Sequence, residues 1–77
     1  MCNNIPEHIL IFKTNITAER DLFAVKTVLD THHLIEQWNI DQTDVDCVLR
    51  VISYHLSYAD IIQIISGLNY FCEELTT

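Results

Sequence analysis

The sequence has few of the residues that interrupt secondary structure. Among its 77 residues there are one glycine and one proline, whereas 49% of the residues are hydrophobic. A disordered chain has the opposite composition, because it cannot bury enough apolar surface to offset the loss of conformational entropy. Disorder is therefore excluded. A chain of this length is expected to form one domain over residues 1–77, with its core at about 8–75.

Basic residues are also scarce. Four Lys and Arg are outnumbered by eleven Asp and Glu, which gives a net charge of −7 near neutral pH. This charge repels the phosphate backbone of a nucleic acid, so we exclude nucleic acid as a partner. If the chain binds a charged protein, that partner is expected to be basic.

Long apolar runs and closely spaced cysteines are missing as well. No apolar run approaches the about 20 residues of a membrane-spanning helix. Met1–Glu7 has neither the basic start nor the apolar stretch of a signal peptide. We therefore expect a cytoplasmic protein with no membrane partner. Cys2, Cys47 and Cys72 are odd in number and far apart, so reduced thiols are expected rather than a disulfide framework.

The apolar residues that are present follow patterns that predict regular elements. The segment "HILIFKT", residues 8–14, is apolar and β-branched in its first half, which predicts a central strand. A helix is predicted over residues 18–31, with Thr17 as its N-cap. Its apolar residues recur at spacings of three and four, as in an amphipathic helix: Leu22, Val25, Val28 and Leu29.

A strand hairpin is predicted next. "LIEQWNI" predicts a strand over residues 35–40, and the polar "DQTD" predicts a turn. "VDCVLRVIS" then alternates between two sets of residues, which predicts a strand that starts at Val45. The two sets are expected to lie on opposite faces of the strand: Val45, Cys47, Leu49 and Val51 on one, and Asp46, Val48, Arg50 and Ile52 on the other.

A second helix and a last strand complete the chain. Ser57 and Asp60 resemble a capping box, and Asn69 can take the left-handed turn that stops a helix. "YFCEEL", residues 70–75, predicts a short strand. The order strand, helix, strand, strand, helix, strand predicts an α+β fold of the ferredoxin-like type. This βαββαβ sandwich packs two helices on one face of a four-stranded antiparallel sheet.

Three stretches resemble one protein family. "LIEQWNI", the following "VDCVLRV" and the terminal "LNYFCEEL" are similar to heavy-metal-associated domains, the fold of small copper chaperones. The resemblance covers about His8 to Leu75. In that family a Met-x-Cys-x-x-Cys motif on the loop after the first strand captures an ion such as Cu(I) with two thiolates. Here Ile16, Ala18 and Asp21 match the three motif positions, so none of the family's metal ligands carries over and no cofactor is expected.

The loop after the first strand remains the candidate site for a partner or a ligand. Its residues lie beside the backbone N–H groups of a helix start, which can hold a small anion or a carboxylate of a partner. Plain helix capping is the simpler interpretation. The candidate residues are Asn15, Thr17, Ala18, Glu19 and Asp21.

Substitute metal ligands are few. His32 and His33 are neighbours at a helix end and would point about 100° apart, so they are not expected to chelate one ion. Cys2 and Asp21 are the other possible ligands. A carrier of zinc, nickel or copper built from such residues stays an alternative.

Catalytic constellations are missing from the sequence. It has no glycine-rich phosphate loop, no nucleophile elbow and no His-Glu-x-x-His motif, so we expect a protein that is not an enzyme. We expect a heavy-metal-associated-like domain without the thiolate clamp, which meets a protein partner through an acidic face or a sheet edge. Exposed sheet edges could also pair two copies into a homodimer.

Overall fold

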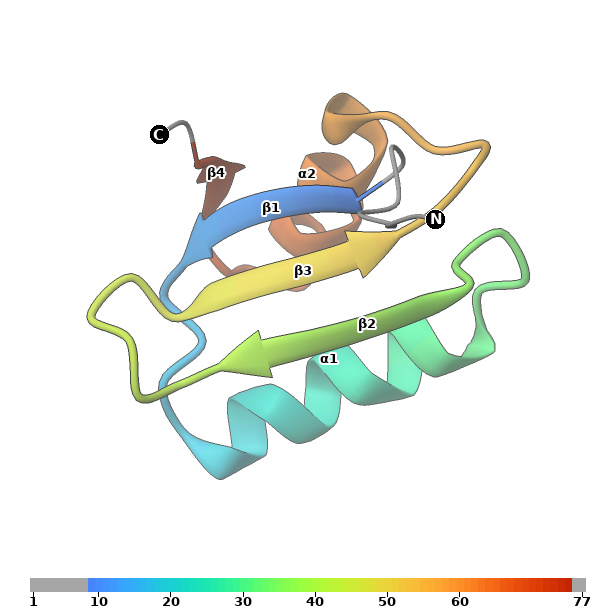
Figure 1. The fold of residues 1–77 in the computed structure, drawn as a ribbon. Coiled ribbons are helices and arrows are strands. Elements are labelled where there is room, and N and C mark those ends of the chain that lie inside the picture. Colours follow the sequence, from blue (N-terminus) through green and yellow to red (C-terminus); the bar gives the residue numbers. More distant parts are fainter. Residues whose placement is uncertain (1–8, 76–77) are drawn as a thin grey trace, which may run out of the picture.

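The computed structural model describes residues 9–75, which form two helices and four strands (Figure 1). All six predicted elements are present in the predicted order. His8 and Cys2 lie outside the described residues. The elements are β1 (Ile9–Thr14), α1 (Glu19–Thr31), β2 (Gln37–Asp41), β3 (Val48–Ile52), α2 (Tyr58–Ser66) and β4 (Cys72–Glu74).

The four strands form one antiparallel sheet in the order β2-β3-β1-β4. β1 is central: Phe12 is opposite Leu49 of β3, and Thr14 is opposite Cys72 of β4. β2 pairs with β3 alone, so β2 and β4 are the two edges. The predicted α+β class and the central position of the first strand are both confirmed.

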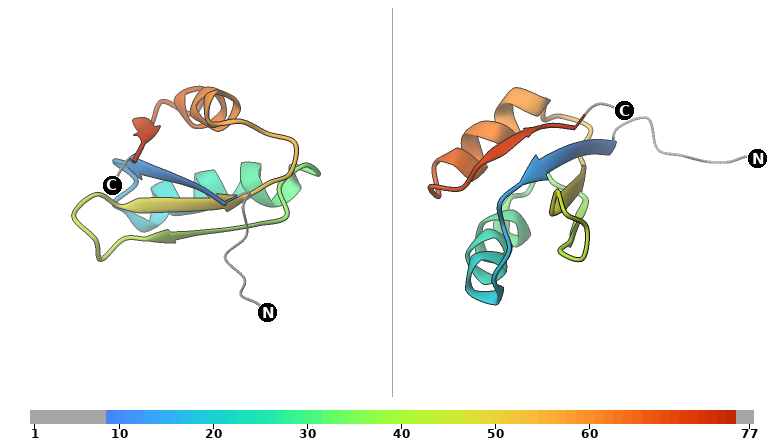
Figure 2. Two further views of the ribbon diagram at one scale, coloured as in Figure 1. Left: turned by 45° about the horizontal axis from the view of Figure 1, so that its top comes forward. Right: turned by 90° about the vertical axis from the view of Figure 1, so that its left-hand side faces the viewer.

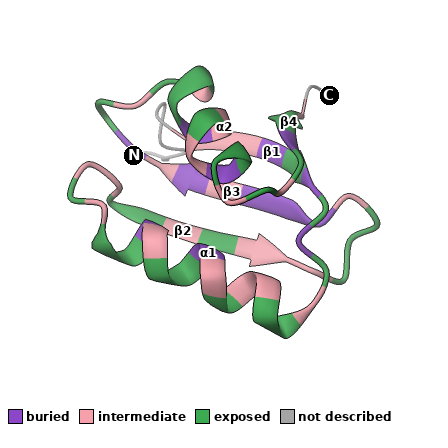
Figure 3. Cartoon of the chain, turned by 180° about the vertical axis from the view of Figure 1, so that it is seen from behind, coloured by how far each residue is buried: buried purple, intermediate pink, exposed green. Residues whose placement is uncertain are grey.

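Both helices lie on the same side of the sheet (Figures 2 and 3). The core lies between this layer of helices and the sheet, because alternate residues of β1 and β3 point toward the helices. Phe12, Leu49 and Val51 come from the sheet. They meet residues from α1 and α2 that are equally buried: Val25, Leu29, Ile61 and Ile65.

The second helix begins and ends as the pattern predicts. Ser57 Oγ accepts a hydrogen bond from the Asp60 backbone N–H at 3.3 Å, and Asp60 Oδ2 accepts one from the Ser57 N–H at 2.9 Å. This reciprocal pair satisfies two N–H groups at the helix start. After Gly67, Asn69 adopts the left-handed conformation with φ of 69°. The capping box and the terminating asparagine are therefore confirmed.

The prediction for the start of the third strand is wrong. β3 begins at Val48, and Val45 is 93% exposed in the turn before it instead of lying on the strand. Asp44 Oδ1 accepts a hydrogen bond from the Asp46 N–H at 2.9 Å, a local turn that competes with strand pairing. Cys47 then adopts φ of 44°, which interrupts the alternation. β4 is also shorter than predicted.

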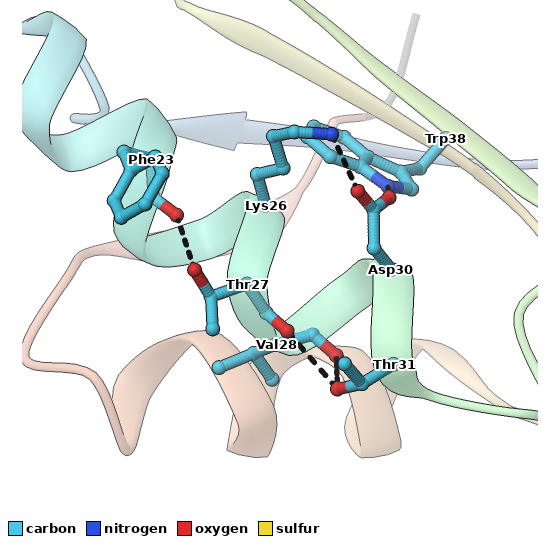
Figure 4. Close-up of polar contacts among 7 residues, drawn as sticks. All are labelled: Phe23, Lys26, Thr27, Val28, Asp30, Thr31 and Trp38. Atoms are coloured by element: carbon cyan, nitrogen blue, oxygen red, sulfur yellow. Dashed lines mark hydrogen bonds and ion pairs between the residues drawn. The ribbon is translucent and has the colours of Figure 1, made fainter.

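One exposed contact joins α1 to the edge strand β2 (Figure 4). Trp38 Nε1 donates to Asp30 Oδ1 at 2.7 Å, and Lys26 Nζ pairs with Asp30 Oδ2 at 2.6 Å. The hydrogen bond from Lys26 lowers the pKa of the Asp30 carboxyl the most, and the hydrogen bond from Trp38 lowers it further. One oxygen of this carboxylate therefore holds the helix against β2, and the other forms an ion pair within α1.

We expect Phe12→Ala to destabilise the domain severely, and Phe23→Ala to change little. Phe12 is fully buried, whereas Phe23 is 69% exposed. Removing the buried ring of Phe12 should lower the free energy of unfolding by about 3–5 kcal/mol. This is as much as the whole net stability of a domain this small. The exposed site should change stability by less than about 0.5 kcal/mol. Urea unfolding at low micromolar concentration measures both. Equal losses would contradict this core.

Candidate functional site

Three segments meet at the end of the sheet where β1 stops, on the left in Figure 1. They are the loop 15–18 that leads into α1, the loop 42–47 between β2 and β3, and the turn 67–71 before β4. In an antiparallel sheet the carboxyl end of β1 lies beside the start of β3 and the start of β4. This topology brings the predicted partner loop together with two segments that the sequence did not connect to it.

The first two loops are tied together by hydrogen bonds. Gln42 Nε2 donates to the carbonyl oxygens of Ile16 at 3.2 Å and Ala18 at 3.4 Å. The Thr14 N–H donates to the Asp46 carbonyl at 3.0 Å. The buried Thr14 hydroxyl donates to the Cys47 carbonyl at 2.7 Å and accepts from the Ile16 N–H at 3.2 Å. The predicted partner loop is therefore held in one conformation by its neighbours.

Asp21 and Asn15 fasten the third segment. Tyr70 donates its hydroxyl hydrogen to Asp21 Oδ1 at 2.9 Å, and the Phe71 N–H donates to Asn15 Oδ1 at 2.9 Å. Asp21 Oδ2 accepts from the Ala18 N–H at 3.2 Å. The bond to Asp21 raises the pKa of Tyr70, because it favours the protonated phenol. Both carboxylate oxygens of Asp21 thus serve structure.

The predicted N-cap of the first helix is wrong by one residue. Ala18, not Thr17, is the N-cap, and it has no side-chain oxygen with which to accept a hydrogen bond. Asp21 provides the polar half of the cap through the Ala18 N–H. Thr17 and Glu19, the two remaining candidate residues, are exposed.

This end of the molecule is strongly acidic, and we call it the acidic end. It carries six carboxylates and two basic residues, Lys13 and Arg20. Lys13 Nζ lies 3.7 Å from Asp46 Oδ1. Hydrogen bonds from Thr43 lower the pKa of the Asp41 carboxyl. The acidic end is defined by Glu19, Asp21, Asp41, Asp44, Asp46 and Glu73.

Two apolar side chains are exposed within the acidic end. Val45 is 93% exposed at the tip of the loop 42–47, and Phe71 is 46% exposed beside Asn15. The alternation in the sequence placed Val45 on a strand and so missed this feature. The Asp-rich composition of "DQTDVD" is the signal that could have found it, because Asp favours local turns over strands.

Cys47 and Cys72 are free and buried on either side of Thr14. Thr14 is the register partner of Cys72, and its hydroxyl donates to the Cys47 carbonyl. Two strand spacings of about 4.8 Å separate cysteines placed in this way, which is beyond the reach of a disulfide. Burial raises the pKa of the Cys72 thiol to about 12.

The histidines considered as metal ligands lie at the C-terminal end of α1. The helix ends at Thr31, so the expectation that their side chains diverge as neighbours on a helix is wrong: their rings stack with centroids 5.8 Å apart. His32 Nδ1 accepts a hydrogen bond from the Leu34 N–H at 3.2 Å. Among residues 9–75 no three His, Cys, Asp or Glu side chains form a group that could hold a metal ion. Cys2 lies outside that range.

Across the part of the chain that the structure describes, neither helix has the length and apolar character needed to span a bilayer. Comparison of the chain with protein-family models, with curated proteins and with solved structures finds no match.

We expect the Cys72 thiol to be unreactive in the folded protein. Its ordinary pKa is 9.0, and its folded value of about 12 keeps the thiolate population very small at pH 8. In a Cys2→Ser background, an aromatic disulfide reagent should label both remaining thiols slowly in buffer and rapidly in urea. Fast labelling of Cys72 in buffer would contradict its burial.

The same shift gives a pH dependence of stability. The unfolded thiol loses its proton near pH 9 but the folded one only near 12, so the folded state binds more protons between these values. The stabilisation from the protonated thiol is complete below pH 9 and is lost as pH rises toward 12. The stability advantage of wild type over Cys72→Ala should therefore shrink across this window. A constant advantage would overturn the assignment.

Proposed function

We propose that the chain is a heavy-metal-associated-like domain with ferredoxin-like topology, which lacks the thiolate clamp and acts as a protein-interaction module. The βαββαβ order supports the fold assignment, as do the spatial order β4-β1-β3-β2 and the helices on one side. In the register of the resemblance, Ile16 is buried, Ala18 is an N-cap and Asp21 is bonded to Tyr70. The three residues at the metal-binding positions of the family therefore have structural roles in this chain.

One observation carries the interaction function: Val45 is 93% exposed between Asp44 and Asp46, at the tip of a loop that its neighbours hold in place. Asp41 Oδ1 accepts from the Thr43 hydroxyl at 2.6 Å, and the Cys47 N–H donates to the Asp44 carbonyl at 2.9 Å. A loop ordered before binding loses little further entropy when a partner docks. The fixed loop therefore favours recognition over a merely solvated turn.

The chemistry of the acidic end specifies the kind of partner. Its carboxylates outnumber Lys13 and Arg20, so they attract a basic surface and raise the association rate. Val45 and Phe71 add apolar contact area within the acidic rim. We therefore propose a partner segment in which Lys or Arg residues flank an apolar side chain.

A random peptide library displayed on phage tests this proposal. Selection on the immobilised domain should enrich peptides that combine Lys or Arg with an apolar residue. The association rate of an enriched synthetic peptide should fall as NaCl rises from about 50 to 500 mM, because salt screens exposed charges. Enrichment of peptides without basic residues, or a rate independent of salt, would refute the electrostatic recognition.

A matched pair of double variants locates the interaction. Asp44→Asn with Asp46→Asn keeps the oxygen acceptor of the turn and removes two charges from the acidic end. We expect it to slow association by about threefold or more. Glu36→Gln with Glu74→Gln makes the same change in net charge at exposed positions outside the acidic end, and should have a much smaller effect. Equal effects would show that only total charge matters.

An anaerobic metal titration tests the alternative that the sequence left open, a carrier with substitute ligands. The reduced protein is titrated with Zn(II), Ni(II) and Cu(I) against a chelator of known affinity, and read by native mass spectrometry. The interaction function predicts no stoichiometric binding tighter than about micromolar. Tight binding that Cys2→Ser abolishes would favour the carrier instead.

A further inference from the structure

Both helices lie on one face of the sheet, and no element of residues 9–75 covers the other face, which is turned toward the viewer in Figure 1. Residues of β1 and β3 that point away from the core form its centre: Ile9, Ile11, Val48, Arg50 and Ile52. The three isoleucines are only partly buried. β2 adds the polar side chains of Gln37, Asn39 and Asp41, and β4 adds Glu73, which is opposite Lys13 in the strand register. We call this surface the open face.

The open face differs from the rest of the chain in its charge. Lys13 and Arg50 are two of the four basic residues, and on this face they are matched by Asp41 and Glu73. The strands therefore contribute no net charge here, whereas the charged residues of the described range 9–75 outside this face, eight Asp and Glu against Arg20 and Lys26, sum to −6. Asp46, from the loop beside it, also approaches Lys13 at 3.7 Å.

The charge of the chain limits how a second copy can bind to it. A second copy of a chain with net charge −7 is repelled from most of the surface, because like charges would meet. On the open face that repulsion is weakest, and each copy brings both signs of charge. We propose that a second copy of this chain packs on the open face, sheet against sheet, and forms a homodimer. Lys13, Asp41 and Glu73 belong to both surfaces, but this inference does not rest on the proposed function of the acidic end.

Arg50 supplies the specific complementarity. Its Nη1 lies 3.4 Å from Asn39 Oδ1, a long contact for a group with five N–H donors. Carboxylates of Asp41 and Glu73 from the second copy can accept the remaining donors, which would otherwise lose water without compensation. Beside Arg50 a shallow hollow of about 80 Å³, lined by Ile9, Gln37 and Ile52 among others, can take a small side chain.

The size of the face sets the strength of the dimer. The three longer strands have five or six residues, and the three spacings of about 4.8 Å between four strands give a face of about 19 by 14 Å. This is smaller than the about 800 Å² that each partner contributes to a standard interface. We therefore expect a weak dimer, and the measurements must extend to about 1 mM protein.

Sedimentation equilibrium of the reduced full chain from about 10 µM to 1 mM tests the proposal. The wild type should shift from monomer toward dimer over this range. Added NaCl should strengthen association, because it screens the repulsion between two acidic chains. This is opposite in sign to the effect expected for a basic peptide at the acidic end. A protein that stays monomeric at 1 mM would overturn the inference and leave the proposed function intact.

Two variants with the same added charge identify the surface. Ile52→Glu places a carboxylate on a central strand of the open face, whereas Phe23→Glu replaces an exposed side chain of α1. The first should weaken dimerisation at least about tenfold, and the second by less than about twofold. Arg50→Glu, a second change on the open face, should weaken the dimer as well. Circular dichroism checks that each variant is folded, and equal effects of the two glutamates would refute the assignment.

Backbone NMR spectra at several dilutions place the interface directly. Shifts that depend on concentration should centre on Ile11, Arg50 and Ile52. Shifts confined to the edge strands β2 or β4, together with a dimer that tolerates Ile52→Glu, would show edge-to-edge pairing and overturn the proposal.

Discussion

Thr14 places a hydroxyl group where only 6% of the residue is exposed, and the acidic end depends on how that hydroxyl is satisfied. A buried hydroxyl without partners costs stability. This one donates to the Cys47 carbonyl and accepts from the Ile16 N–H, while the Thr14 backbone N–H donates to the Asp46 carbonyl. One residue at the end of β1 therefore fixes both the loop that leads into α1 and the loop that carries Val45.

The hydrogen bonds at the acidic end depend on one another. Thr14 positions the loop 15–18, Asp21 holds the N–H of Ala18, and Tyr70 is held by Asp21 in turn. Among residues 9–75 no buried side-chain nitrogen or oxygen lacks a hydrogen-bond partner. Networks that are fully satisfied favour one conformation over others. Polar contacts therefore hold the segments of the acidic end together, whereas apolar packing holds the helices against the sheet.

The sequence was sufficient for the elements and the core because both depend on periodicity. Val25 and Leu29 of α1 are four residues apart, as are Ile61 and Ile65 of α2, and the structure buries all four. The turn 42–47 could not be predicted this way, because side-chain bonds of Asp41 and Asp44 and the positive φ of Cys47 override the alternation. The bond from Tyr70 to Asp21 joins residues 49 positions apart, so no local pattern contains it. The balance of charges on the open face could not be predicted from the sequence either, because it depends on which residues the strand register places side by side.

The contact between α1 and β2 has a consequence for observing the molecule. Trp38 is the one tryptophan of the chain, and its indole N–H donates to a carboxylate on α1. When light that the three tyrosines absorb only weakly is used for excitation, the fluorescence of the unlabelled protein comes from this single indole, whose surroundings change when the helix leaves the sheet. Tryptophan fluorescence can therefore follow the docking of α1 on the sheet, while circular dichroism follows the helical content separately.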